Sequence, residues 1–347
     1  MGERALHGVN LTGWLELESW VTPSLFADSG ALDEQALITV LGRKRYAALV
    51  EEHRSSFIGA SDFVKIASRG FNAVRLPVPW YVFGPDGPDA GPYVGCIDYV
   101  DEAFSWAEEV CLKLVLVLSV SPGSREDENL TICGKADFRG YRDHLTSVVR
   151  ALSARYAHRE GFFGIEVLEE PVVQRRNFLQ VTDGVPIHVL RNYYRDAYNA
   201  VRAAAGDDPV VILPDGGVPG GWGAFMAQSQ YQKVWLDCHL THHRDKVNIT
   251  GPSGVRRLAD ASRASLEATK KSGLPAMVGA WSGALPFADS LMTPEGHIAL
   301  ERVYLSEQIA AFRKCPAWFS QTRKTEGRIS GWDARVSLAT FERRMLD

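Results

Sequence analysis

The sequence predicts an α/β fold, a single (β/α)8 TIM barrel. Eight apolar, strand-like runs alternate with amphipathic helical stretches along the 347 residues. Runs such as residues 114–118 are apolar on both faces, which is typical of parallel strands covered by helices. No Gly-x-Gly-x-x-Gly motif follows an early strand, which disfavours an open dinucleotide-binding sheet.

The expected strands are, in chain order, residues 8–14, 72–78, 113–120, 163–168, 210–213, 234–240, 276–281 and 317–321. Helical patterns lie between them, for example at residues 97–111, 140–156, 187–204, 255–271 and 297–313. Segments rich in Gly and Pro, at 84–92 and 218–223, follow strands, where a barrel has the loops of its catalytic face. No linker, repeat or low-complexity tract interrupts the pattern, so we expect one domain over residues 1–347.

Composition narrows the range of partners. The hydrophobic content of 46% and charged content of 23% are ordinary for a globular chain, and the net charge of −4 gives no sign of nucleic-acid or anionic-membrane binding. The five cysteines lack metal-ligand spacing. We therefore expect a monomer that acts on a small molecule without a cofactor or metal. The start of the chain has no secretory h-region, which favours a cytoplasmic protein or a secreted one whose leader has been removed.

The opening segment carries a long and specific resemblance. Residues 8–15 read G-V-N-L-T-G-W-L, and residues 17–26 read L-E-S-W-V-T-P-S-L-F. This order resembles the opening of glycoside hydrolase family 5, on its exo-β-1,3-glucanase side. The resemblance continues over nearly the whole chain and implies the same barrel fold. Within this segment we consider Glu18 a candidate substrate-binding residue.

A second segment suggests that a catalytic group has been replaced. Residues 278–282 read V-G-A-W-S, which resembles the V-G-E-W-S stretch that carries the family's nucleophile. Ala280 takes the nucleophile position, and alanine cannot attack an anomeric carbon. The following Trp281 is a candidate substrate-binding residue.

The acid side of the predicted site is retained. Residues 164–171 read G-I-E-V-L-E-E-P, similar to the family's G-I-E-L-L-N-E-P, so Glu170 takes the acid/base position and Glu169 replaces an asparagine that binds a sugar hydroxyl. Adjacent carboxylates raise each other's proton affinity, which favours a neutral Glu170. The resemblance implies that Arg75 contacts the nucleophile; an alternative is a structural salt bridge from Arg75 to Glu169.

Other positions near the reacting sugar also depart from the family pattern. His239, which we place among the catalytic residues, is retained. The substitutions are Thr241 for a tyrosine, Ser119 for a histidine, and Gln321 and Arg323 for two tryptophans. We expect all of these in the substrate subsite, with Arg323 adding positive charge beside Arg75.

Three functions remain open from the sequence. The first, which this pattern favours, is a repurposed acid-catalysed lyase, isomerase or cyclase that acts on a polar or anionic metabolite with Glu170 as the proton donor. The second is a β-glucoside or β-1,3-glucan hydrolase, including an engineered variant with alanine in place of the nucleophile. The third is a non-catalytic binding protein on a glycosidase scaffold. Fold alone does not choose among them.

Overall fold

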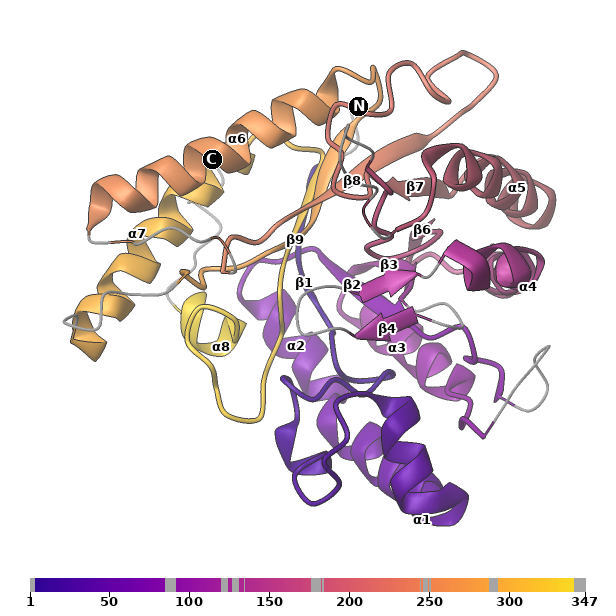
Figure 1. Ribbon diagram of the computed structural model, residues 1–347, viewed down its shortest axis with the longest axis horizontal. Helices are drawn as coiled ribbons and strands as arrows, with labels where there is room; N and C mark the ends of the chain where they lie inside the picture. The colour runs from indigo at the N-terminus through magenta and orange to yellow at the C-terminus, as the bar shows by residue number, and fades with distance from the viewer. Residues whose placement is uncertain are drawn as a thin grey trace.

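Figure 1 shows the computed structural model, which describes residues 4–84, 92–119, 124–126, 131–133, 135–175, 182, 184–243, 245, 249, 251–286 and 293–339. Its centre is a closed barrel of eight parallel strands in the order β1-β10-β9-β8-β7-β6-β3-β2. The barrel strands are β1 (Leu6–Asn10), β2 (Ala73–Val78), β3 (Lys113–Leu118), β6 (Phe162–Glu166), β7 (Val210–Pro214), β8 (Val234–Leu240), β9 (Ala276–Trp281) and β10 (Ala317–Ser320). The predicted (β/α)8 barrel is therefore confirmed. Val120, the end of one expected strand, lies outside the described residues.

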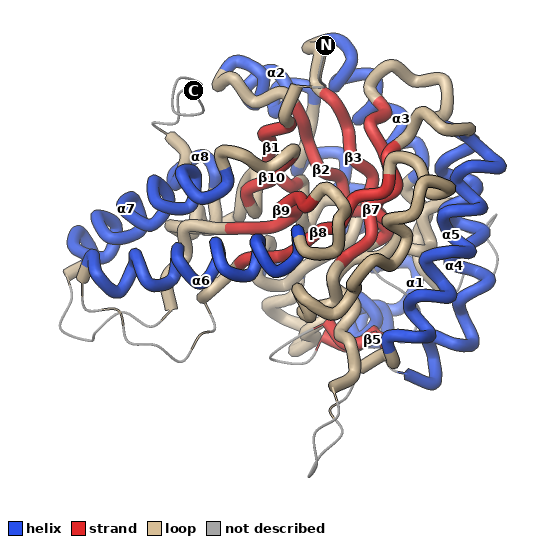
Figure 2. The backbone as a smooth tube through the Cα atoms, turned by 90° about the horizontal axis from the view of Figure 1, so that it is seen from above, coloured by secondary structure: helices blue, strands red, loops and turns tan. Residues whose placement is uncertain are grey.

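Helices surround the barrel strands in both backbone views (Figures 1 and 2). They are α1 (Glu34–Phe57), α2 (Ala60–Ser68), α3 (Ile97–Glu109), α4 (Lys135–Tyr156), α5 (Ile187–Ala205), α6 (Pro252–Lys270), α7 (Pro294–Phe312) and the short α8 (Ala334–Ser337). The sequence did not single out α1 and α2, or the hairpin of β4 (Ser124–Glu126) and β5 (Thr131–Cys133), which Figure 2 shows apart from the barrel. No helix in the described part of the chain is both long and apolar enough to cross a bilayer.

The barrel interior is filled by apolar side chains from alternate strand positions. Its members include Leu6, Val115, Ile212, Met277 and Phe319, all buried. This layer supports the base of the barrel, as inward-facing side chains do in this architecture. Polar residues replace it toward the carboxyl ends of the strands, and these residues form the candidate site.

Candidate functional site

Arg75 lies at the centre of the site and is almost fully buried on β2. Its Nε and Nη2 donate to Glu166 Oε2 at 3.0 and 2.8 Å, and its Nη1 donates to Asn10 Oδ1 at 2.8 Å and Glu169 Oε1 at 2.7 Å. Nη2 also lies 3.7 Å from Asp237 Oδ2. A guanidinium has five N–H donors, and these partners occupy them. Burial opposes its charge, but the surrounding carboxylates raise the pKa of Arg75 above its ordinary value.

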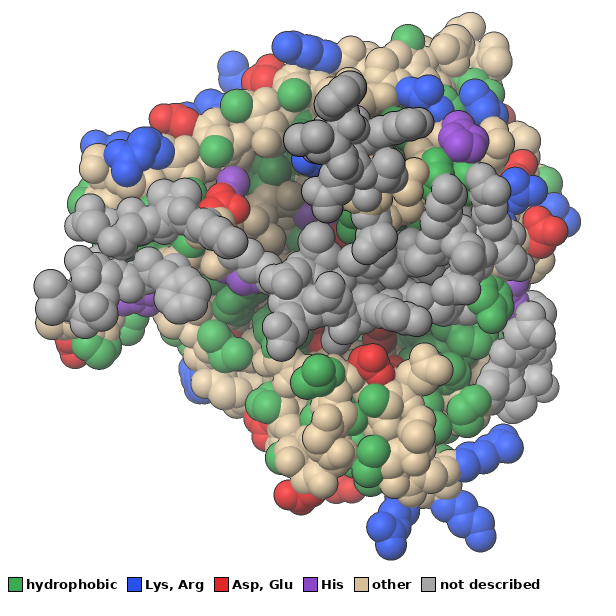
Figure 3. Space-filling view, viewed as in Figure 1, with side chains coloured by type: hydrophobic (Ala, Val, Ile, Leu, Met, Phe, Trp, Pro, Cys, Tyr) green, Lys and Arg blue, Asp and Glu red, His purple; other side chains and the backbone are tan. Residues whose placement is uncertain are grey.

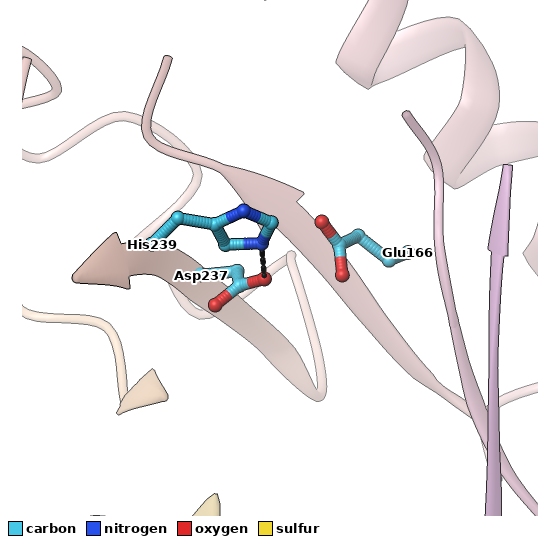
Figure 4. Close-up of side chains that lie close together, drawn as sticks. All are labelled: Glu166, Asp237 and His239. Atoms are coloured by element: carbon cyan, nitrogen blue, oxygen red, sulfur yellow. Dashed lines mark hydrogen bonds and ion pairs between the residues drawn. The ribbon is translucent and has the colours of Figure 1, made fainter. Parts of the chain in front are cut away.

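Two fully buried carboxylates, Glu166 of β6 and Asp237 of β8, contact this arginine across the barrel interior. Burial, with Asp237 nearby, raises the pKa of Glu166 well above its usual range, while Arg75 opposes the shift. Asp237 Oδ1 accepts from the backbone N–H of Gly279 at 2.5 Å. A Cβ at Gly279 would lie 1.8 Å from Asp237 Oδ2, so only glycine fits there. Figure 4 shows both carboxylates pointing toward the imidazole of His239.

His239 connects this buried network to the barrel mouth. Its Nε2 lies 3.1 Å from Asp237 Oδ2, and its Nδ1 lies 2.5 Å from Glu170 Oε1. Burial alone would lower the pKa of His239, but the Asp237 and Glu170 carboxylates raise it well above 6.5. Both ring nitrogens face carboxylate oxygens, which favours the protonated imidazole, and Arg75 Nη2 also lies 3.3 Å from Nε2. The Glu170 side chain is 43% exposed and reaches the solvent side of this pair.

A register slip places Ala280 beside this pair. Cys238 pairs with Val278, but His239 pairs with Ala280, which leaves Gly279 as an extra residue in β9. Such irregularities redirect side chains near active sites. Ala280 therefore faces the same way as His239, next to the histidine that holds Glu170. Its side chain is a buried methyl group.

The group formed by Glu166, Asp237 and His239 has ligand atoms close enough to hold a metal ion. Arg75 Nη2, however, already supplies a positive charge 2.8 Å from Glu166 and 3.7 Å from Asp237. A divalent cation between these carboxylates would lie against that guanidinium. We therefore assign the group to charge balance around Arg75 rather than to metal binding.

The remaining predicted residues are spread over the strand ends. Ser119 donates to Glu16 Oε2 at 2.5 Å, and Glu18 accepts from the indole N–H of Trp20 at 2.6 Å. Thr241 and Gln321 are half-buried just after β8 and β10. The structure therefore brings Arg75, Glu169, His239 and Glu170 into one network, and it places Ser119, Thr241 and Gln321 directly after the ends of β3, β8 and β10.

Two predicted site residues are corrected by the structure. Trp281 is fully buried, and its ring packs 5.6 Å from Phe312 of α7 and 5.3 Å from Trp318 of β10, so it belongs to the core outside the barrel. Arg323 directs its guanidinium to Asp62 of α2, with contacts of 2.9 and 3.1 Å. Its charge is paired there and is not added to that of Arg75.

Sequence reasoning assigned no role to several residues that complete the site. Glu166 lies within the quoted segment 164–171, and Asp237 lies two positions before His239. Neither gave a separate signal, because their roles depend on contacts between strands. Burial and the neighbouring Glu18 raise the pKa of Glu16 well above its usual range. Half-buried Trp20 and Trp332 pack with their ring centroids 5.2 Å apart, joining the loops after β1 and β10.

The charge around the site does not favour an anionic ligand. Glu16, Glu18 and Glu169 lie near one another, and the positive charge of Arg75 is matched by buried carboxylates. On the face shown in Figure 3, most visible Lys and Arg side chains lie at the periphery, and hydrophobic, acidic and histidine side chains surround a hollow nearer the centre. This differs from the expectation of a polar or anionic ligand at a site where Arg323 adds positive charge beside Arg75.

Comparison with known proteins finds relatives that are described as probable glucan 1,3-beta-glucosidases. None of the protein-family models compared with the chain matches it. Probable glucan 1,3-beta-glucosidase A of Aspergillus niger is 30% identical, over 96% of this chain and 86% of the relative. The Aspergillus clavatus protein of the same description is 33% identical over 96% and 86%.

Solved structures share the fold. Rutinosidase from Aspergillus niger superimposes with a TM-score of 0.77 at 18% identity, covering 95% of this chain and 93% of that one. A variant of a glycoside hydrolase family 5 enzyme from Prevotella bryantii, in complex with a xyloglucan tetradecasaccharide, gives a TM-score of 0.64 at 13% identity, with 99% and 96% covered.

Proposed function

Because the chain belongs to the glucan 1,3-beta-glucosidase family of glycoside hydrolases, we propose that it acts on β-linked glucosides, with Glu170 exchanging a proton with the glycosidic oxygen. The observation that carries this proposal is the Glu170–His239 contact of 2.5 Å at the mouth of the barrel. It places a partly exposed carboxyl group beside a histidine whose pKa is raised, so a proton can be shared between the two groups at the barrel mouth.

The proton for the leaving group comes from this pair. Asp237 holds the far side of the imidazole at 3.1 Å and keeps the ring charged. Transfer of a proton from Nδ1 to Glu170 gives a carboxylic acid, which then protonates the glycosidic oxygen as the bond to the anomeric carbon breaks. The imidazole recovers its proton from solvent through Glu170 when the leaving alcohol has departed.

The group that attacks the sugar is where this site differs from that of a retaining enzyme. A retaining enzyme needs two carboxylates about 5 Å apart, one of which attacks the sugar. Ala280 supplies none, and its methyl group leaves more room than a glutamate at the same position. We propose direct attack by water there, with Glu169 accepting the water's proton. The new C–O bond forms as the glycosidic bond breaks, so the product has the inverted configuration.

A neutral sugar fits this site better than an anionic metabolite does. The donors of Arg75 and both nitrogens of His239 are already occupied. The acidic side chains of Glu16, Glu18 and Glu169 can accept hydrogen bonds from hydroxyl groups, and the Glu18 and Glu169 carboxylates repel a carboxylate or phosphate. The acid-catalysed lyase, isomerase or cyclase that the sequence favoured therefore loses its physical basis, which was a positively charged site.

The test combines turnover with binding. Hydrolysis of an aryl β-glucoside and of short β-1,3-linked glucans should be detectable, and proton NMR of the first product should show the α anomer. Azide, a small nucleophile that fits beside Ala280, should accelerate release of the aryl group and give an α-glucosyl azide. Absence of both hydrolysis and calorimetric binding of these sugars would overturn the proposal; binding without turnover would leave only the carbohydrate ligand and reject the hydrolytic step.

A further inference from the structure

A cavity of about 600 Å³ lies between the first turn of α2 and the segment that follows β10. Residues from the end of α1 close one side, including Ser55 and Ile58. It is distinct from the Arg75 network, although the two approach each other through the backbone: Arg323 N–H donates to the Asn10 carbonyl at 2.8 Å, and the Asn10 side chain accepts from Arg75.

The lining of this cavity is strongly basic. Its cationic side chains are Lys65, Arg69, Arg323, Lys324, Arg328 and Arg335. Asp62 is the lining carboxylate. The chain as a whole has a net charge of −4, so the charge of this cavity is opposite in sign to that of the whole chain.

The available carboxylates neutralise only part of this charge. Asp62 is shared by Arg323 and Lys324, with contacts of 2.9 and 3.3 Å. Arg335 pairs with Asp333 at 2.6 Å. The remaining lining cations are Lys65, Arg69 and Arg328, and none of them forms an ion pair with a residue that the structure describes. Arg69 instead donates to the Leu338 carbonyl at 3.0 Å.

The neighbouring cations affect the pKa of Lys324. Burial lowers the pKa of Lys324, and Arg335 and Arg323 lower it further, while Asp62 opposes them. The Lys324 Nζ also lies 4.9 Å from the ring centroid of Phe57. Arg323 is only 4% exposed, so its charge is held in place rather than dispersed in solvent. An anion in the cavity would relieve this repulsion.

We propose that this cavity binds a small molecule bearing a phosphate-type oxyanion. Guanidinium and ammonium donors from several directions match the oxygens of such a group, and their charge-assisted hydrogen bonds are the strong class. The volume is within the range of small-molecule sites and exceeds what one ion needs. Free phosphate and a phosphate ester share this chemistry. The inference is independent of the proposed glycosidase activity.

Calorimetric titration of the full chain tests the proposal. The probes are inorganic phosphate and glucose 6-phosphate, with glucose as the neutral control at matched ionic strength. Both phosphates should bind with one site and raise the melting temperature, and glucose should not compete with either. Tighter binding of glucose 6-phosphate identifies a phosphate ester as the better ligand, whereas equal binding identifies the phosphate group alone.

Variants locate the site. Lys65→Gln with Arg328→Gln removes two cations that have no ion pair to lose, and should weaken phosphate binding roughly tenfold or more. The matched control is Lys44→Gln with Arg45→Gln, two exposed cations of α1, which should bind phosphate as the parent does. Equal weakening in both double variants, unchanged binding in the first, or binding only of a polyanion such as heparin would each overturn the proposal.

Discussion

Arg75 donates to Glu169 across 2.7 Å, and this contact gives the guanidinium a carboxylate partner at a barrel mouth where Ala280 offers none. The motif resemblance implies an asparagine at position 169 and the nucleophilic glutamate at position 280. The two substitutions therefore conserve negative charge and move it from β9 to the residue after Leu168. Glu169, together with the buried Glu166 and Asp237, leaves the buried Arg75 paired although position 280 is an alanine.

Ala280→Glu alone is expected to restore little activity, because Glu169 already pairs with Arg75 and a further buried carboxylate has no cation of its own. Ala280→Glu combined with Glu169→Asn restores the family pair and should exceed either single variant by roughly a hundredfold or more in rate. Initial rates on an aryl β-glucoside, with the product anomer, provide the measurement. Brisk turnover by Ala280→Glu alone would reject charge relocation.

Glu170→Gln should lower hydrolysis by roughly 10²–10⁴-fold, because the amide keeps the shape of the side chain but cannot donate the proton. Sugar binding, measured by calorimetry, should change little. The matched control is Glu160→Gln, an exposed residue in the turn before β6, which should retain the parent rate. Parent-like turnover by Glu170→Gln would remove this residue from the proton-transfer step.

The barrel could be predicted from sequence because burial on both faces leaves continuous apolar runs. The expected segment 234–240 coincides with β8 and 276–281 with β9, for this reason. The hairpin of β4 and β5 has strands of only three residues each, too short for a periodic pattern.

Side-chain directions at the site could not be predicted in the same way. Trp281 follows Ala280, and simple alternation gives no warning of the slip at Gly279 that sets which side each residue faces. Arg323 turns toward Asp62, a partner 261 positions away in the chain. The sequence left two alternatives for Arg75, contact with the nucleophile position or a salt bridge to Glu169. Only the distance between the Arg75 and Glu169 side chains in the folded chain could decide between them.

The pH dependence of stability should report the charge on His239. Its folded-state pKa is raised well above 6.5, so protonation favours the folded state. The stabilisation is fully present below about pH 6.5 and is lost as pH rises through the folded-state pKa, at roughly 1.4 kcal/mol per pH unit within that window. The difference in unfolding free energy between parent and His239→Asn should therefore be larger at pH 6 than at pH 9.

Urea unfolding at several pH values measures this difference. Asp237→Asn is the informative control, because it removes the carboxylate that raises the pKa of His239 most, and it should flatten the dependence. A gap between parent and His239→Asn that widens with rising pH would contradict an imidazolium held by Asp237 and Glu170.

Gly279→Ala tests whether the close approach of β8 and β9 sustains the site. The added methyl group would lie 1.8 Å from Asp237 Oδ2, so Asp237 must leave its contacts with the Gly279 amide and with His239. We expect destabilisation of about 1–3 kcal/mol, typical of overpacking, together with loss of hydrolysis. The matched control is Gly220→Ala, where an added Cβ meets open space and should leave both stability and rate unchanged. Full activity in Gly279→Ala would mean that Asp237 does not need its observed position to hold His239 against Glu170.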